Sequence, residues 1–245
     1  MSELRIEHFD THVEATIDRP STRNAISRAM IDEFHELCAS LEREPRVLLI
    51  AGSREVFASG ADIAELRERT AADALAGINS RAFDRIHRLP MPVIAAIDGW
   101  ALGGGAELAY AADIRIAGEG LRIGHPETGL GILAAAGATW RLPEIVGEAV
   151  AADLLFTGRR LDAHEALRVG LVSRVVPSFR LLDEARATAA QIAANDPLAT
   201  RLTKAALAAP RAEHPEIDDR TQAILFESPE KHRRMSEFLA KRRRP

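Results

Sequence analysis

Apolar side chains recur with two different periods in the first half of the chain. Apolar and polar residues alternate over residues 4–8 and again over residues 13–17, a two-residue period that predicts a β-hairpin. From Ser27 to Glu42 the apolar positions recur at helical spacing, which predicts a helix. Residues 47–51 form a short, wholly apolar run between a proline and a glycine, which is typical of a buried strand.

The middle of the chain continues this alternation of strands and helices. Residues 57–63 include four small residues in a row and predict a loop. Residues 64–89 predict one or two helices with Phe83 and Ile86 facing the core. The apolar run of residues 93–97 predicts a second buried strand, followed by three glycines and an alanine-rich helical segment.

In the second half, strands become rare. Residues 114–117 and 121–124 predict two further strands on either side of a Gly-Glu-Gly turn. From Pro143 onward helical patterns dominate, with one strand expected near residues 171–176. Such a sequence of elements predicts an α/β core followed by a C-terminal helical layer.

Composition narrows the class of protein. With 245 residues, 47% of them hydrophobic, one α/β domain with a small helical extension is favoured over two equal domains. The formal net charge of -4 argues against a general binder of nucleic acid or membrane surfaces.

Cysteine usage and hydropathy indicate the compartment. The one cysteine, Cys38, excludes an internal disulfide framework and falls in a helical pattern, so we expect a core residue rather than a nucleophile. The most apolar stretch, residues 92–117, contains four charged residues, which argues against a membrane span. The N-terminus has strand patterning rather than that of a secretory signal. A soluble cytoplasmic protein is expected.

Two segments of small residues offer backbone amides to a ligand. They are Ser59-Gly60-Ala61 and Gly103-Gly104-Gly105. Three glycines before a helix suggest a backbone that must approach something closely. If the two segments converge, one amide from each would hold a carbonyl oxygen as it gains negative charge. The alternative is that both are tight turns in a packed sheet.

Glu107 and Glu127 form the second candidate constellation. Each follows a turn and is surrounded by small or apolar residues, where a charge is costly unless it has a partner or a function. Two carboxylates in a partly dry pocket push their pKa values apart. One can then hold a proton while the other takes one, as addition or removal of water requires. The alternative is two glutamates that cap or salt-bridge helix starts.

Other chemistries find less support in the sequence. There is no H-E-x-x-H, Cys-x-x-Cys or acidic calcium loop, so no metal is expected, and no G-x-S-x-G nucleophile elbow. The triple glycine lacks the dinucleotide spacing. His125 either lines the same pocket as Glu127 or is a neutral structural histidine. The basic run from Lys241 is either a solubilising tail or a source of phosphate contacts.

The motifs resemble those of the crotonase (enoyl-CoA hydratase/isomerase) superfamily, closest to its two-glutamate enoyl-CoA hydratases, over nearly the whole chain. The matching segments, in order, are Arg19-Pro20, residues 23–25, 57–63, 101–109, 112–115, 124–127, 129–131 and 238–242. The resemblance implies an α/β fold with a ββα spiral core over residues 1–190 and a C-terminal helical oligomerisation region over residues 191–245. It also implies a homo-oligomer, a trimer or a hexamer.

The resemblance implies a reaction as well. Hydratases of this family add water to trans-2-enoyl-CoA and give 3-hydroxyacyl-CoA in fatty acid or related acyl-CoA degradation. Coenzyme A is part of the substrate, and no cofactor is expected. Glu107 would activate the water and Glu127 would deliver the α-proton, while the amides of Ala61 and Gly104 would form the oxyanion hole. The matched motifs further imply substrate contacts from Arg23, Ala25, Ser59, Gly60, Asp62, Ile63, Gly103, Ala135, Trp140 and Lys241.

The chain departs from the hydratase pattern at three places. Ala135 replaces a glycine whose backbone helps to place the water, Ala64 stands where a lysine often contacts the nucleotide, and Trp140 replaces a smaller polar residue. These changes leave two alternatives open. One is another reaction of the superfamily, namely isomerisation, decarboxylation or thioester hydrolysis. The other is a catalytically weak protein that binds acyl-CoA.

Overall fold

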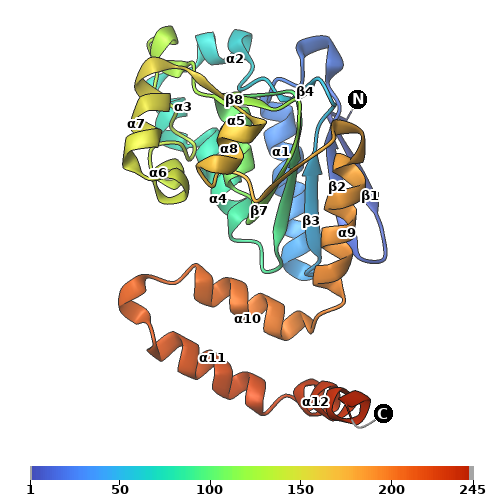
Figure 1. Ribbon diagram of the computed structural model, residues 1–245. Coiled ribbons are helices and arrows are strands. Elements are labelled where there is room, and N and C mark those ends of the chain that lie inside the picture. Colours follow the sequence, from blue (N-terminus) through green and yellow to red (C-terminus); the bar gives the residue numbers. More distant parts are fainter. Residues whose placement is uncertain (1, 243–245) are drawn as a thin grey trace.

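The strands of the chain form two separate β-sheets (Figure 1). The computed structural model describes residues 2–242. The six-stranded sheet has the order β1-β2-β3-β5-β7-β10 and the four-stranded sheet the order β4-β6-β8-β9. The strands are β1 (Leu4–His8), β2 (His12–Ile17), β3 (Val47–Ala51), β4 (Val56–Ala58), β5 (Val93–Ile97), β6 (Trp100–Leu102), β7 (Ile114–Gly118), β8 (Arg122–Gly124), β9 (Arg160–Asp162) and β10 (Arg174–Val176).

The larger sheet is covered on both faces. Its β1 and β2 form the expected antiparallel hairpin, and β2, β3, β5, β7 and β10 run parallel. Because side chains alternate along a strand, Leu48 packs in the cluster that contains α1 (Arg28–Arg43), and Leu49 packs in the cluster that contains α9 (Leu181–Ala193). Cys38 is buried in α1, as expected.

Three consecutive strand pairs wind into a spiral. In each pair the first strand (β3, β5 or β7) joins the larger sheet and the second (β4, β6 or β8) joins the smaller one. The two strands around Gly118-Glu119-Gly120 therefore belong to different sheets and do not pair as a hairpin. The predicted ββα spiral core is confirmed.

The segment from residue 63 to residue 87 is divided more finely than its sequence pattern indicated. It forms three helices, α2 (Ile63–Glu68), α3 (Ala71–Ala76) and α4 (Ile78–His87), rather than one or two. Thr70 and Asp73 cap the start of α3 reciprocally, and Gly77 ends it in a left-handed conformation. The sequence pattern did not predict the three-residue strands β4, β6 and β9, because three residues are too few to show an alternation of apolar and polar side chains.

Helices dominate the remainder of the chain. They are α5 (Gly104–Tyr110), α6 (Arg141–Val146), α7 (Glu148–Thr157), α8 (Ala163–Arg168), α10 (Pro197–Leu207), α11 (Glu216–Phe226) and α12 (Pro229–Arg242). The last three form an arm that extends away from the sheets (Figure 1). The expected boundary between residues 190 and 191 falls inside α9, which packs on the larger sheet.

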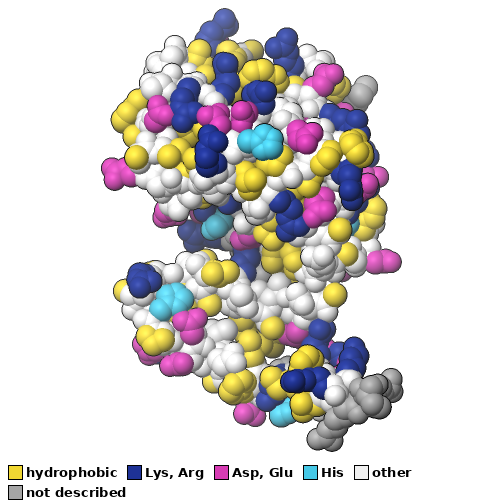
Figure 2. Space-filling view, in the orientation of Figure 1, with side chains coloured by type: hydrophobic (Ala, Val, Ile, Leu, Met, Phe, Trp, Pro, Cys, Tyr) yellow, Lys and Arg dark blue, Asp and Glu magenta, His cyan; other side chains and the backbone are white. Residues whose placement is uncertain are grey.

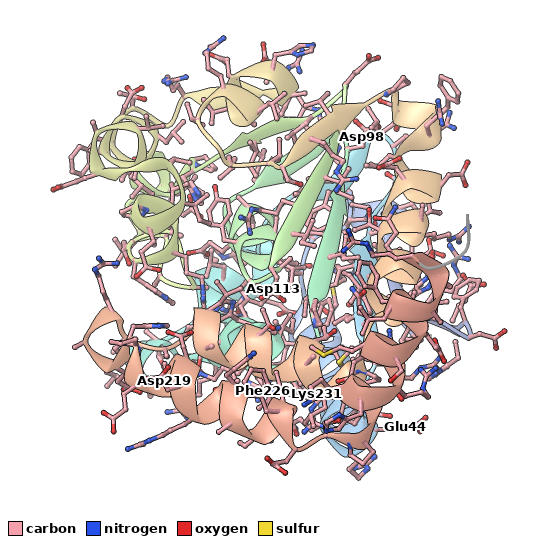
Figure 3. All side chains as sticks on the ribbon, turned by 60° about the horizontal axis from the view of Figure 1, so that its bottom comes forward. Glu44, Asp98, Asp113, Asp219, Phe226 and Lys231 are labelled. Carbon is pink, nitrogen blue, oxygen red and sulfur yellow. The ribbon has the colours of Figure 1, made fainter. Side chains whose placement is uncertain are left out.

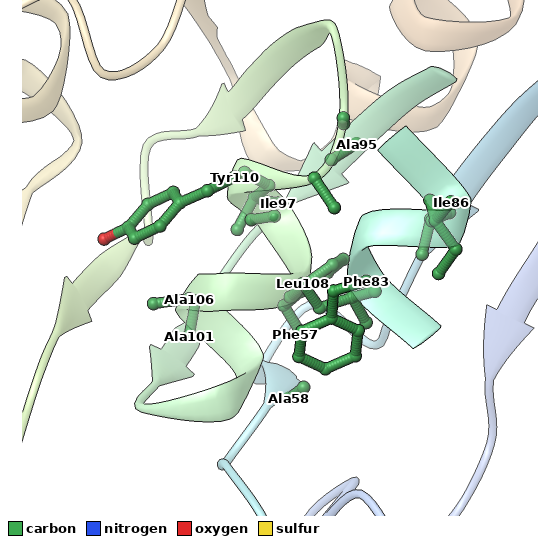
Figure 4. Packing of buried hydrophobic residues seen from close by; sticks show 14 of the residues in the cluster. Phe57, Ala58, Phe83, Ile86, Ala95, Ile97, Ala101, Ala106, Leu108 and Tyr110 are labelled. Atoms are coloured by element: carbon green, nitrogen blue, oxygen red, sulfur yellow. The ribbon is translucent and has the colours of Figure 1, made fainter. Parts of the chain in front are cut away.

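The first turn of α5 lies against β4 with no space for a side chain between them. A Cβ built on Gly105 would overlap the backbone carbonyl of Ala58. Figure 4 shows the apolar contacts beside this point, where Leu108 of α5 meets Phe57 of β4 and Phe83 of α4. This close approach sets where α5 begins.

We expect Gly105→Ala to destabilise the protein, because its Cβ would force α5 away from the Ala58 carbonyl. Overpacking of this kind costs about 1–3 kcal/mol, sometimes more. Chemical denaturation measures the loss of unfolding free energy. Gly129→Ala is the matched control, since nothing lies within 4 Å of a Cβ built there. Equal stability of the two variants would contradict this packing.

Candidate active site

Three loops meet at one end of the smaller sheet. β4, β6 and β8 are parallel neighbours, so their carboxyl ends lie at the same edge, where α/β proteins bind ligands. Ser59-Gly60-Ala61 follows β4, Gly103 follows β6, and residues 125–127 follow β8. The amide of Gly103 donates to the carbonyl of Gly124 (2.9 Å), which joins the second loop to the third.

A cavity of about 490 Å³ opens where these loops meet. Its lining includes both candidate glutamates and residues of α2, α3, α4 and the loop after β8. The lining residues are Ser59, Gly60, Ala61, Ile63, Leu66, Arg69, Thr70, Asp73, Ala74, Gly77, Ile78, Asn79, Ser80, Gly103, Gly104, Glu107, Pro126, Glu127, Leu130, Ile132, Leu133, Ala135 and Ala136.

The backbone amides of Ala61 and Gly104 lie side by side. A Cβ built on Gly104 would be 3.4 Å from the Ala61 nitrogen. Gly104 is the first residue of α5, where an amide has no partner within the helix. Neither amide donates a hydrogen bond to another residue of the described range 2–242. Two amides without partners in this range therefore lie next to each other in the lining of the cavity.

The Ala61 loop is held by its flanking residues. Ile26 donates its amide to the Gly60 carbonyl (2.8 Å), and its own carbonyl accepts from the Asp62 amide (3.0 Å), which leaves the Ala61 amide free. The Asp62 carboxylate caps α2 and pairs with Arg19 at 2.8 Å. The hydrogen bond from Arg19 is the main cause of the lowered pKa of Asp62.

Glu107 is buried in α5 and is 3% exposed. Its Oε1 accepts hydrogen bonds from the amides of Ala136 (2.6 Å) and Ala138 (3.1 Å). Burial raises the pKa of Glu107, and these two amides partly offset that effect because they stabilise the ionised form. The alternative in which Glu107 only caps a helix start does not fit a carboxylate held by a remote loop.

Glu127 begins a short 3₁₀ helix (Glu127–Leu130) after β8 and is 8% exposed. Its carboxylate lies against the backbone of Gly103, where a Cβ would be 2.5 Å from Oε1. Gly103 has φ +51°, a conformation that side chains disfavour. The glycine is therefore required by its backbone and by the space that Glu127 occupies.

His125 does not line the cavity, in contrast to one of the two alternatives for it. The ring is buried, and its Nε2 lies 3.0 Å from the hydroxyl of Tyr110 on α5. Tyr110 was missed from the sequence, although a residue three positions after Glu107 on a helix shares its face.

The alanine-rich loop over residues 134–138 carries both donors to Glu107. Ala135 lines the cavity, while the amides on either side of Gly137 bond to Glu107. Among the described residues, Arg23 and Asn24 are the non-glycine residues with positive φ. Ala135 therefore adopts no conformation that only glycine tolerates.

Several residues expected to contact substrate lie outside the cavity lining. Ala25 is buried, and its carbonyl accepts from Arg19 (3.0 Å). Asp62 holds the loop as described above. Arg23 and Trp140 are exposed beside the site elements, and Lys241 is exposed on α12. All other predicted site residues line the cavity.

Apart from Ile63, which was predicted as a substrate contact, the wall formed by α2, α3 and α4 was not predicted. It includes Arg69, which donates to Asn79 (3.0 Å), and this wall carries no motif that the sequence would reveal. Across residues 2–242, no group of three or more His, Cys, Asp or Glu side chains is arranged to hold a metal ion. Within the same range, no helix combines the length and apolar character needed to cross a bilayer.

Comparison with known proteins gives consistent matches. The model of the enoyl-CoA hydratase/isomerase family matches residues 10–244. The short-chain-enoyl-CoA hydratase of Clostridium acetobutylicum is 38% identical, over 87% of this chain and 82% of that protein. The crotonyl-CoA hydratase of Syntrophomonas wolfei is 40% identical, over 78% of this chain and 75% of that protein. The crystal structure of the enoyl-CoA hydratase from Bacillus anthracis superposes with a TM-score of 0.93 at 31% identity, covering 98% of this chain and 96% of that one.

We expect Glu107→Gln to stabilise the fold at alkaline pH. Because burial raises the pKa of Glu107, the folded protein favours the neutral carboxyl, and this stability is lost as pH rises through the raised value. Glutamine keeps an oxygen for both amides and never ionises. The variant should therefore melt above the wild type at pH 8, with a smaller difference at pH 5.

Calorimetry or circular dichroism at both pH values measures this difference. Glu36→Gln, at an exposed position of α1, is the control and should show no such pH dependence. The same melting temperature for Glu107→Gln and the wild type at both pH values would refute the prediction.

Proposed function

Because the chain belongs to the enoyl-CoA hydratase/isomerase family, we propose that it adds water to trans-2-enoyl-CoA and forms 3-hydroxyacyl-CoA. The observation that carries this proposal is the meeting of two buried carboxylates, Glu107 and Glu127, with two free amides at one cavity. Addition of water needs one group to take a proton and another to give one. No cofactor is needed, since coenzyme A enters as part of the substrate.

The amides of Ala61 and Gly104 are the proposed oxyanion hole. When water attacks C3 of the enoyl group, negative charge moves to the thioester oxygen. Two fixed donors at that oxygen stabilise the charge without reorganisation, and loss of one such donor typically costs about 10²–10³ in rate. Their adjacency and lack of other partners support this role.

The bonding changes assign one proton transfer to each glutamate. Ionised Glu107 takes a proton from water as the water oxygen bonds to C3. The π electrons of the C2=C3 bond pass through the enolate, and C2 then takes the proton that Glu127 supplies. Burial raises the pKa of Glu107 and so makes its ionised form a stronger base, while two amides keep that form accessible. Proton exchange with solvent restores both carboxyls.

We further propose that the protein assembles as a homo-oligomer, a trimer or a hexamer. The arm formed by α10, α11 and α12 buries none of its described residues in this chain. Leu207 is 82% exposed, Phe226 is 51% exposed and Phe238 is 60% exposed. Figure 2 shows hydrophobic side chains spread over the arm below the core. Isolated helices are marginal in water, so a second copy is the proposed cover.

Two finer points complete the proposal. Lys241 on α12 would reach the CoA phosphates of a substrate bound to a neighbouring copy, since its own chain's cavity does not include it. A reducing, cytoplasmic location is supported by the free, buried Cys38.

Turnover of crotonyl-CoA tests the function. We expect the wild type to remove the ultraviolet absorbance of the conjugated thioester and to form a product heavier by one water. Glu127→Gln and Glu107→Gln should each lower kcat about 10²–10⁴-fold, because one proton transfer is lost. No turnover of any enoyl-CoA across several chain lengths would refute the proposal.

Two further observations separate the alternatives. A product of unchanged mass would indicate isomerisation, and binding without turnover in calorimetry would indicate an acyl-CoA-binding protein. Gly104→Pro removes one amide at a helix position that accepts proline. Wild-type activity in a folded Gly104→Pro protein would contradict the oxyanion assignment.

Light scattering coupled to size-exclusion chromatography tests the assembly. We expect the mass of three or six chains of 26.7 kDa. Removal of residues 195–245 should yield smaller species or aggregates, because the arm supplies the contact surface. A monomeric full-length protein with well-ordered helices would contradict the proposed role of the arm.

A further inference from the structure

Behind the cavity, a buried polar layer supports Glu127. The ring of His125 is 1% exposed, and its Nδ1 lies 3.5 Å from Glu127 Oε2. Among residues 2–242, neither of these two atoms has a hydrogen-bonding partner. Buried polar groups are rarely left unpaired. Two unpaired atoms that face each other at this distance are therefore candidates for one hydrogen bond between them.

We propose that Tyr110 and His125 form a buried relay that holds the Glu127 carboxylate in position, an inference that rests on the proposed function. The Tyr110 hydroxyl lies 3.0 Å from His125 Nε2, at the far side of the ring from Glu127. Neither residue lines the cavity. Both therefore act through Glu127 as positioning residues.

The hydrogen-bonding roles follow from the available partners. If the phenol donates to Nε2, then Nδ1 carries the ring proton and directs it at Glu127 Oε2. If Nε2 carried the proton, the phenol O–H would have no acceptor within the described range, and the Nδ1 lone pair would face the carboxylate that Glu127 becomes after it gives up its proton. A doubly protonated ring also leaves the phenol without an acceptor. The first arrangement alone satisfies every group.

The surroundings keep this arrangement in place. Burial raises the pKa of Tyr110, so the phenol stays protonated and remains a donor. Figure 4 shows the Tyr110 hydroxyl pointing away from Phe57 and Leu108 of the apolar cluster. The other charged groups that act on Tyr110 are Glu107 of α5 and Arg115 of β7. Arg115 itself bonds to the carbonyls of Leu171 and Ala112.

The relay serves both geometry and proton transfer. One oxygen of Glu127 faces Nδ1 at 3.5 Å, and the other lies beside Gly103 at the cavity wall. When Glu127 gives its proton to C2, it becomes a carboxylate, and the Nδ1–H donor stabilises that product. Catalytic hydrogen bonds are often long without substrate, so the 3.5 Å separation is expected to shorten in the complex.

The first test is the pH profile of crotonyl-CoA hydration by Tyr110→Phe and His125→Leu. Loss of a hydrogen bond to a charged group lowers rates about tenfold to a hundredfold, which we expect in kcat with KM little changed for His125→Leu. The pH profile of kcat should differ from that of the wild type, since the Nδ1–H donor to the carboxylate of Glu127 is lost. His125→Gln, which keeps an N–H donor, should recover most of the activity.

The double variant Tyr110→Phe, His125→Leu tests whether the two residues act through one relay or through two independent packing effects, because independent effects on kcat add. Because Tyr110 acts through the imidazole, Tyr110→Phe should change nothing further in the His125→Leu background. His12→Gln is the control, since His12 is buried on β2 beside Thr11, away from the cavity. A wild-type pH profile in folded Tyr110→Phe and His125→Leu, or additive effects of the two, would overturn the relay.

A measurement without turnover keeps the two proposals distinct. In ¹⁵N-histidine NMR, His125 should carry its proton on Nδ1 in the wild type, and this preference should be lost in Tyr110→Phe. An Nε2-protonated ring in the wild type would overturn the relay even if hydration is active. Absence of enoyl-CoA turnover together with the Nδ1 tautomer would contradict the proposed function alone.

Discussion

Gly105 allows the backbone of α5 to rest on the carbonyl group of Ala58 at the end of β4, and this contact sets the geometry of the cavity. It brings the first amide of α5 beside the amide of Ala61, which the bridge to Ile26 leaves unpaired. It also sets the depth at which Glu107, one turn along the helix, enters the core. A side chain at residue 105 would move the Gly104 amide and Glu107, both on α5, away from the amide of Ala61.

The cost of the site is the burial of charge. Glu107 and Glu127 both lie in the interior, and folding must compensate for their lost hydration. The compensation is different for each. Two amides of the loop over residues 134–138 bind Glu107, whereas Glu127 faces a histidine whose other nitrogen contacts Tyr110. An apolar core of the same volume would be more stable, because no buried carboxylate would need the amides of the loop or the histidine as partners.

The C-terminal arm contributes to the protein in another way. Lys204 of α10 donates to Asp113 (2.7 Å) and to the carbonyl of Met91 (3.1 Å), which ties the arm to the core. Figure 3 shows Asp113 at the edge of the core that faces the arm, with Phe226 and Lys231 further along it. The amides and glutamates of the cavity all come from residues before α6, so the arm adds exposed apolar surface rather than the reacting groups.

Local sequence determined which segments form the spiral and which residue types the cavity contains. The periods of residues 4–17 and 27–51 gave the hairpin, α1 and β3, since such patterns depend on neighbours within a few positions. The glycines at 103–105 and the two isolated glutamates were likewise visible. The tertiary structure decided the partners: the amides of Ala136 and Ala138 at Glu107, the part of the cavity wall formed by α3 and α4, and the orientation of His125. These contacts join segments far apart in the chain, and no local pattern specifies which distant loop will meet a given side chain.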